Sequence, residues 1–536
     1  MKPIIPYLVA FGPVLLLSIL FIPRDWANAN PHVMTKLTGG LTWIALGAAV
    51  LATFGFLNHG RITLNFFTIG STEGFHFAVG VFFDSLSAIM LLLVSFMGAV
   101  VTRYAENYLD GDAKQGQFMK WLAVTIGSVL TLIVSGNLVM FVLAWVATSM
   151  SLHKLLLFYP ERPAAQLAAR KKFIISRTGD LCLVGAMTLI YTSFNNLDFG
   201  QIFAAADALR AAGSEDVGAF TWIALLLALG ALLKSAQFPF HSWLPEVMET
   251  PTPVSALLHA GIINAGGFLI VRMSPVFSLS PIALDFLAVV GAFTALFASV
   301  VMLTQTSIKT SLAYSTVAQM GFMMLQCGLG AYAAAVLHIV AHSMYKAHAF
   351  LSSGSIIDIA RSSWVPTRRE KPHMFQLIAA LFMALGLTLA MAWAFGITPD
   401  KEPGVVVLGS VLMMAVTHLI WNSFGDEYTL PVAARGVVMA VTVCFVFFTL
   451  QSLFAFMLAG ALPELHPLRT SFDIWLMGGV IILFMAVLVF QTQLPYRADN
   501  PAWQKMYVYA FNGLYVNTFA NKLVERFWPI DTKQAA

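Results

Sequence analysis

The chain has 536 residues, of which 59% are hydrophobic and only 10% are charged, and its formal net charge is +4. Soluble globular domains carry about 25% charged residues, so this composition excludes both a soluble enzyme and a disordered chain. The small net charge gives no indication of a nucleic-acid partner. Apolar runs of about 20 residues recur along the whole sequence, which predicts an all-α polytopic membrane protein in the lipid bilayer.

Fifteen apolar segments follow one another in chain order. They are residues 3–22, 39–58, 80–102, 118–135, 138–159, 172–193, 219–249, 253–273, 280–304, 309–328, 331–356, 375–396, 404–424, 436–460 and 471–491. The segment 219–249 is too long for one straight span, and Phe238-Pro239-Phe240 interrupts it. We therefore expect about 14–15 transmembrane helices, one of them broken into two half-helices.

Lysine and arginine are distributed unequally between the two sides of this threading. With the N-terminus outside, the inner loops and the tail hold twenty of them and the spans hold four. The outer segments hold six, namely Lys2, Arg61, Arg210, Arg272, Lys401 and Arg469. This bias follows the positive-inside rule and predicts a cytoplasmic C-terminus.

A further helix is expected after the last span, over residues 500–530. Asn500 is a suitable capping residue and Pro501 a suitable first-turn residue. Apolar residues then recur every three or four positions, at Trp503, Met506, Tyr507, Phe511, Leu514, Tyr515 and Phe519, with Lys505, Lys522 and Arg526 interspersed. The pattern predicts an amphipathic interfacial helix on the cytoplasmic surface. The alternative is a poorly ordered tail with scattered aromatic residues.

Ionisable side chains inside the apolar spans are the candidates for function, because each costs about 2.5–3.5 kcal/mol at a helix centre. Lys234 precedes the predicted break, and Glu246 and His259 follow it. A broken helix leaves backbone groups free to bind ions or water, and a desolvated lysine can release its proton. The alternative is that Lys234 extends its ammonium to the membrane surface.

His338, His342 and Lys346 form a second set. Spacings of four place them along one face of a helix, about 12 Å from end to end. Such a series suits proton relay through intervening waters. The alternative is three separately satisfied polar residues between packed helices.

For two smaller sets of ionisable residues, a structural role and a functional role remain equally open. Arg177 and Asp180, which follow Lys171, are three residues apart and can form an ion pair on a helix. His153 and Lys154 lie in the fifth span and could instead reach the membrane surface.

The cysteines do not indicate a metal or redox site. Cys182, Cys327 and Cys444 each stand alone in an apolar segment and are interpreted as small buried hydrophobic residues. The sequence shows no motif for an iron–sulfur cluster, haem or zinc. We therefore expect no cofactor, no bound metal and no enzymatic activity in this chain.

Several stretches resemble the antiporter-like membrane subunits, which include the NuoL-type subunit of respiratory complex I and the MrpA-type subunit of sodium/proton antiporters. They are Lys234-Ser235-Ala236-Gln237, His241-Ser242-Trp243-Leu244-Pro245-Glu246, Pro251-Thr252-Pro253-Val254-Ser255-Ala256-Leu257-Leu258-His259-Ala260, Arg177-Thr178-Gly179-Asp180, and a later block with Ile308-Lys309, Leu312-Ala313-Tyr314-Ser315-Thr316, Gln319-Met320-Gly321, His338, His342, Lys346 and Ser352-Ser353-Gly354-Ser355. The resemblance covers roughly residues 80–360.

This resemblance implies two inverted five-helix repeats with a broken helix in each, here residues 118–273 and 280–424. Residues 1–117 and 434–491 would be flanking membrane helices. The implied ion-translocation residues are Lys234, Glu246, His259, His338, His342 and Lys346, supported by Lys154, Lys171, Arg177, Asp180, His241 and Lys309.

The sequence also departs from the complex I pattern. Those subunits carry a glutamate directly after a tryptophan in the fifth helix, but here Trp145 is followed by Val146. They also carry a charged residue in the second broken helix, whereas 375–396 has none and His418 is the nearest candidate. The long C-terminal arm helix is absent too.

A shorter type of subunit resembles the chain more closely. Ser151-Leu152-His153-Lys154-Leu155-Leu156-Leu157-Phe158-Tyr159, Arg162-Pro163, Ala168-Ala169-Arg170-Lys171-Lys172-Phe173, Asn500-Pro501-Ala502-Trp503 and Asn512-Gly513-Leu514-Tyr515 are similar to the DabB family. DabB proteins are the membrane subunits of two-component inorganic-carbon accumulation complexes. The resemblance implies a bacterial inner-membrane protein and a DabA-like zinc protein as partner, docked on the cytoplasmic side. It also implies that H+ or Na+ flow through this chain drives hydration of CO2 in that partner.

Two other functions remain open at this stage. One is a proton- or sodium-pumping subunit of a complex I-like or Mrp-type antiporter assembly, which would also need Lys234. The other is an inert membrane anchor for a catalytic partner, which would not need it.

Overall fold

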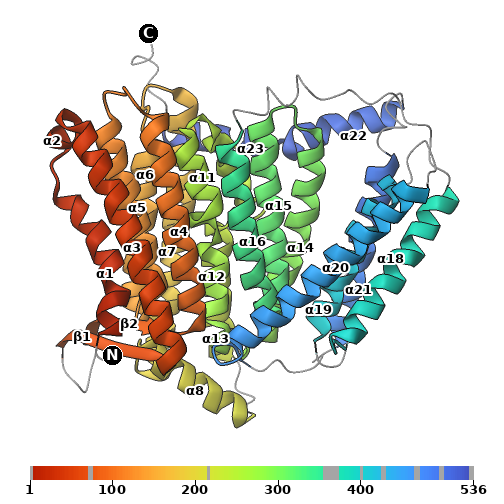
Figure 1. Cartoon of the computed structure of the whole chain (residues 1–536), viewed down its shortest axis with the longest axis horizontal. Helices are drawn as coiled ribbons and strands as arrows, with labels where there is room; N and C mark the ends of the chain where they lie inside the picture. The colour runs from red at the N-terminus through yellow and green to blue at the C-terminus, as the bar shows by residue number, and fades with distance from the viewer. Residues whose placement is uncertain are drawn as a thin grey trace.

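The structure is a computed structural model and describes residues 4–70, 76–213, 218–353, 374–398, 402–423, 430–463, 471–493 and 500–529. Most helices run between two opposite faces of the molecule, with the start of α1 at one face and the last described helices, α22 and α23, at the other (Figure 1).

The helices of the first part of the chain are α1 (Ile5–Leu17), α2 (Arg24–Ala29), α3 (Pro31–His59), α4 (Ser85–Tyr108), α5 (Gln115–Val134), α6 (Leu138–Leu156), α7 (Pro163–Phe194), α8 (Phe199–Ala211) and α9 (Gly218–Lys234). They are followed by α10 (Trp243–Glu246), α11 (Thr252–Ala260), α12 (Ala265–Arg272), α13 (Ser274–Phe277), α14 (Pro281–Thr304), α15 (Ile308–Gly328) and α16 (Tyr332–Leu351). The last are α18 (Met374–Ala394), α19 (Pro403–Ser423), α20 (Leu430–Leu458), α21 (Ser471–Gln493), α22 (Pro501–Phe511) and α23 (Val516–Phe527).

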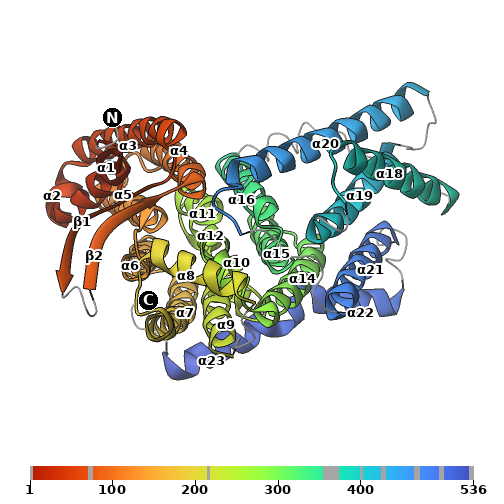
Figure 2. The ribbon, with the colours of Figure 1, turned by 90° about the horizontal axis from the view of Figure 1, so that it is seen from below.

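Every one of the fifteen predicted spans coincides with a helix or a broken helix, and the predicted polytopic helical membrane fold is confirmed. Within the described residues, ten helices are long and apolar enough to cross a membrane. Seen end-on, α20 reaches from α16 to α18, and α18, α19 and α21 lie at the end of the molecule opposite α1, with α21 packed on α14 (Figure 2).

A β-hairpin between α3 and α4 was not predicted. Strands β1 (Ile62–Gly70) and β2 (His76–Phe83) pair antiparallel, with Ile62 opposite Phe83. The third span therefore starts at residue 85 and not at 80. Asp84 fixes this start, because its carboxylate accepts a hydrogen bond from the backbone N–H of Ser87 at 2.9 Å.

Asp84 also forms a buried ion pair with Arg272 at the end of α12. The two side chains are 2.7 Å apart and nearly inaccessible, and the guanidinium donates a further hydrogen bond to Ser87 Oγ at 2.6 Å. Asp84→Ala leaves Arg272 buried without its partner, so we expect a loss of about 3–5 kcal/mol of unfolding free energy. Thermal unfolding in detergent measures this loss, and replacing Arg272 with Leu as well should restore most of it.

A matched control is the more exposed pair of Asp207 and Arg210 on α8, which are 2.9 Å apart. Asp207→Ala should cost about 0–1 kcal/mol, as exposed pairs do. Equal losses for Asp84→Ala and Asp207→Ala would contradict a structural role for the buried pair.

The predicted break in the seventh span is confirmed, and a second one lies beside it. Helix α9 ends at Lys234, and the chain resumes as a short 3-10 turn at Phe240. The eighth span is also interrupted, between α11 and α12 at Gly261, which the sequence analysis did not predict. The hydroxyl of Ser235 donates to the carbonyl of Ile263 at 2.7 Å, so the two breaks meet.

The repeats themselves stay a prediction. Over their described residues, α14, α15, α16, α18 and α19 run without interruption, so the second broken helix that the resemblance implies is not seen there. Helices α14 and α15 pack closely, because a Cβ on Gly321 would lie 2.5 Å from the backbone nitrogen of Ala295.

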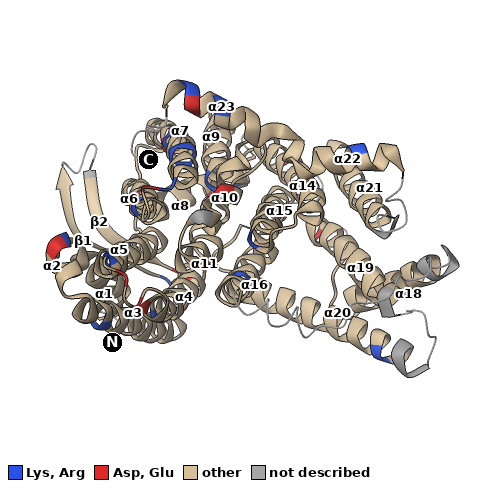
Figure 3. Cartoon of the chain, turned by 90° about the horizontal axis from the view of Figure 1, so that it is seen from above, with Lys and Arg blue, Asp and Glu red and all other residues tan. Residues whose placement is uncertain are grey.

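The predicted C-terminal amphipathic helix is present but consists of two pieces. Asn500 caps α22 as expected, accepting from the N–H of Ala502 at 2.9 Å. A turn at Gly513–Tyr515 then separates α22 from α23. Seen from the face that carries them, α22 lies beside α14 and α21, and α23 lies beside α7 (Figure 3).

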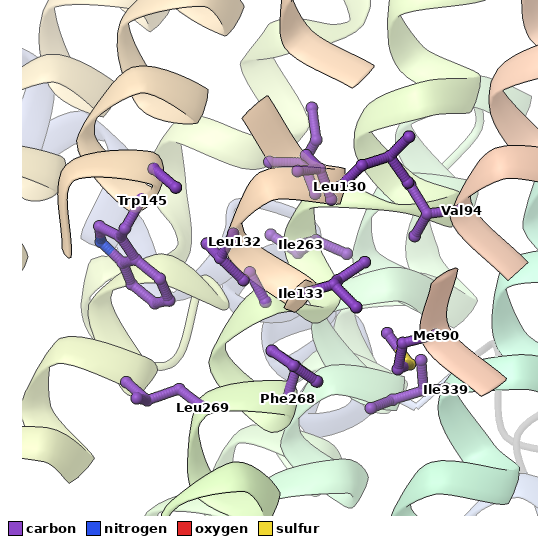
Figure 4. Close-up of a cluster of buried hydrophobic side chains, with 14 of the residues drawn as sticks. Met90, Val94, Leu130, Leu132, Ile133, Trp145, Ile263, Phe268, Leu269 and Ile339 are labelled. Carbon is purple, nitrogen blue, oxygen red and sulfur yellow. The ribbon is translucent and has the colours of Figure 1, made fainter. Parts of the chain in front are cut away.

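The hydrophobic core lies around α11 and α12, where the surrounding membrane helices pack against them. Figure 4 shows Met90 and Val94 of α4, Leu132 and Ile133 of α5, and Phe268 of α12 among its closely packed side chains. Trp145 of α6 borders this cluster and is 1% exposed. Its indole forms the wall of the site described next.

Candidate ion-translocation site

Lys234 is buried where α9 ends. Its side chain is 6% exposed, and its Nζ lies 4.5 Å from the ring centroid of Trp145 on α6. The ammonium has no hydrogen-bond partner among the residues that the structure describes. A charge held in this way is stabilised by the aromatic face and by neighbouring charges alone.

Helix α7 supplies those charges. The predicted pairing of Arg177 with Asp180 is confirmed at 2.8 Å. Asp180 also interacts electrostatically with Lys234 and with Lys172. The Nζ of Lys172 donates hydrogen bonds to the carbonyl and the hydroxyl oxygens of Ser149, at 2.6 and 2.8 Å. One carboxylate is thus shared by three cations, and a change in the protonation of Lys234 alters the balance among all of them.

Glu246 does not join this cluster. It lies in α10 and forms an ion pair with Lys171 of α7. Both side chains also bind the C-terminal helix α23, through Asn517 and Asn521. The sequence analysis did not predict these two amides as part of the site.

His241 is fully buried. Its ring stacks near Phe238 and lies 6.2 Å from the ring of Tyr314 on α15. Within the described part of the chain, neither ring nitrogen has a hydrogen-bond partner. Buried polar groups of this kind are expected to bind water.

The third group centres on α16. Lys346 is 0% exposed and donates to the carbonyl of Leu312 at 3.0 Å. His342 and His338 follow along the same helix, with ring centroids 5.9 Å apart. His259 of α11 joins this group, since it interacts electrostatically with Lys346 and its Nδ1 lies 2.9 Å from the hydroxyl of Thr316.

The remaining predicted residues lie outside these groups. Lys154 is exposed on α6, and Lys309 is half-buried in the first turn of α15. His418 lies on α19, with its ring centroid 6.0 Å from that of Trp421. Among the described residues, no group of three or more His, Cys, Asp or Glu side chains is placed to hold a metal ion.

Comparisons with known proteins define the class. The family described as "NADH:quinone oxidoreductase/Mrp antiporter, TM" matches residues 135–398, and "NADH-Ubiquinone oxidoreductase (complex I), chain 5 N-terminus" matches residues 69–119. A solved chain of the Mrp complex from Dietzia sp. DQ12-45-1b shares the fold, with a TM-score of 0.65 at 21% identity over 95% of this chain and 59% of that one. The protein is therefore an ion-translocating, multi-pass membrane subunit of the antiporter-like class.

Curated relatives narrow this class. The "Probable inorganic carbon transporter subunit DabB2" of Halothiobacillus neapolitanus is 39% identical over 97% of this chain and 94% of its own length. The "NAD(P)H-quinone oxidoreductase chain 5" of Synechocystis sp. is also 39% identical, but over 54% of this chain and 42% of its own length. The chain belongs to the DabB family of inorganic carbon transporter subunits, a family of membrane transport subunits and not of enzymes.

Proposed function

We propose that this chain conducts H+ or Na+ across the bacterial inner membrane and couples this flow to the uptake of CO2 or bicarbonate. The observation that carries the proposal is Lys234, a buried ammonium without a described hydrogen-bond partner, at a helix break and beside a shared carboxylate. Such a group can load and release a proton when the charges around it change.

In this proposal Lys234, Glu246 and His259 belong to the entrance half-channel, and His338, His342 and Lys346 form the central relay. The half-channel is a series of separate steps and not one cluster, because Glu246 pairs with Lys171 and His259 lies beside Lys346. The meeting of the two helix breaks at Ser235 and Ile263 supports this division, because it joins the end of α9 to the segment that carries His259. Unpaired backbone groups and bound water at such breaks provide the steps between side chains.

The partner in this proposal is a DabA-like zinc protein that docks on the cytoplasmic side, where the C-terminus also lies. The proposal is supported by the names of the DabB relatives, which describe them as subunits of an inorganic carbon transporter. Catalytic zinc needs about three protein ligands and an open coordination position. We assign this zinc site to the partner.

Copurification tests the partner. The chain expressed alone should be zinc-free and inactive, and with its partner it should copurify with a zinc protein and accumulate inorganic carbon. A protonophore or a sodium ionophore should stop the accumulation, and which of them does so identifies the ion. Stoichiometric zinc in this chain alone, or uptake without a second subunit, would overturn the assignment.

A pump subunit of a complex I-like or Mrp-type assembly is the second candidate. It is supported by the antiporter family match and by the Mrp fold. The lengths favour the first candidate, because the chain covers 94% of the DabB2 relative and 42% of the quinone oxidoreductase one.

A further inference from the structure

The C-terminal helices form a strap that is fixed at both ends. At the first end, the hydroxyl of Tyr507 donates to the carbonyl of Thr304 at 3.3 Å, and the amide of Gln305 donates to the carbonyl of Phe511 at 3.1 Å. At the other end, Arg170 of α7 donates to the carbonyl of Trp528 at 2.8 Å and stacks over its indole. The strap therefore connects the end of α14 to the start of α7.

Between these anchors, α23 completes the polar contacts of Lys171 and Glu246. The Lys171 ammonium donates to the side-chain oxygens of Asn517 at 2.7 Å and Asn521 at 2.5 Å, in addition to its ion pair with Glu246. An ammonium has three donors, so all three are used. The amide of Asn521 also donates to Glu246 at 3.0 Å, which makes this residue the bridge between the two charges.

The turn between α22 and α23 is held in a conformation that side chains rarely adopt. Gly513, Leu514 and Tyr515 have φ angles of 54°, 53° and 59°. A Cβ at Gly513 would lie 3.0 Å from the hydroxyl of Tyr314, whose ring is the neighbour of His241. Left-handed backbone at two non-glycine residues persists only where the surroundings impose it, so the turn has a fixed seat on the body of the protein.

We propose that α23 seals the inner entrance of the ion path, and that Asn517 and Asn521 are positioning residues that hold Lys171 against Glu246. The inference rests on the proposed function, because it concerns the regulation of the same entrance. A cation that approaches Glu246 meets the positive charge of Lys171, which repels it. When α23 lifts, Lys171 loses two of its acceptors and Glu246 loses its bridge, so the carboxylate becomes accessible from the cytoplasm.

Hydrogen exchange and transport, measured on the full complex in vesicles, test the seal. Asn521→Leu and the double variant Asn517→Leu/Asn521→Leu should raise amide exchange in residues 516–527 and 243–249 by about tenfold, because hydrogen bonds to charged groups are lost. Passive ion leak should rise and carbon uptake should fall by a similar factor. Asn512→Leu is the control, since among the described residues that side-chain amide donates hydrogen bonds to Val508 and Tyr515, both within the strap itself.

A charge swap separates docking from ion entrance. Asn521→Asp alone places two carboxylates together and should release α23, whereas Asn521→Asp with Glu246→Gln restores one acid and one amide beside Lys171. The swap should therefore restore slow exchange in α23 but not uptake. A merely structural role for Asn521 would instead predict that uptake returns together with docking.

Two results would overturn the proposal. One is an undocked α23 with normal uptake and no leak, and the other is unchanged exchange in the double leucine variant. Lys234→Ala and Lys346→Ala, measured in the same preparation, test the proposed ion-conducting function separately from the seal. If these two variants keep their uptake, the ion-conducting function itself is wrong, whatever α23 does.

Discussion

Lys234→Ala is expected to leave membrane insertion intact and to lower inorganic-carbon uptake by about 100-fold or more, the order of magnitude that a proton-transfer group contributes. The side chain is buried and has no hydrogen-bond partner in the described part of the chain, so its removal relieves a desolvation cost. It also removes a titratable ammonium that interacts with Asp180 at the helix break. Accumulation of labelled bicarbonate in cells, normalised to the amount of complex, measures the loss.

Lys234→Arg should fail to the same degree. Arginine keeps the positive charge over Trp145 but cannot release its proton. The control is Lys36→Ala, which removes an exposed lysine from α3 and should leave uptake unchanged. Near-normal uptake by either Lys234 variant would show that the chain acts as an anchor and not as an ion conductor.

The local features of this site could be predicted from the sequence. A charged residue four positions before Phe238-Pro239-Phe240, inside an apolar segment too long for one span, indicates both the break and the buried lysine. The spacings of four between His338, His342 and Lys346 place them on one helix in the same way. Each of these inferences uses only neighbours within a few turns of the chain.

The pairings between distant segments could not be predicted. Asn521 lies 275 positions from Glu246, and Arg272 lies 188 positions from Asp84. Arg272 was therefore counted as an outer-loop charge, although it is buried in an ion pair. Glu246 was grouped with Lys234 because the two are close in sequence, but the turn after α9 directs it to Lys171.

The secondary structure that was missed has a similar explanation. Residues 62–67 alternate between more and less exposed side chains, which is typical of a strand, but so short a pattern is hard to recognise in a sequence dominated by apolar membrane helices. The break at Gly261 also lacks a proline, the usual sequence marker of an interrupted helix.

The second large loss of uptake is expected from changes to the proposed relay on α16. His338→Ala, His342→Ala and Lys346→Ala should each lower uptake by roughly 10- to 100-fold, and double variants should be little worse than the weaker of their singles. The reason is that the three groups act in series. His342 lies between the other two on α16, with its ring 5.9 Å from that of His338, so one missing group already interrupts the path.

The matched control is His348→Ala, because His348 lies on the same helix but is exposed. It should leave uptake unchanged, whereas a general disturbance of α16 would affect it as well. Side chains that merely pack between helices make independent contributions, and their losses add. Small single losses that add in the double variants would therefore assign these residues to packing, and His259, which is held by Thr316 beside Lys346, would then have no relay to join.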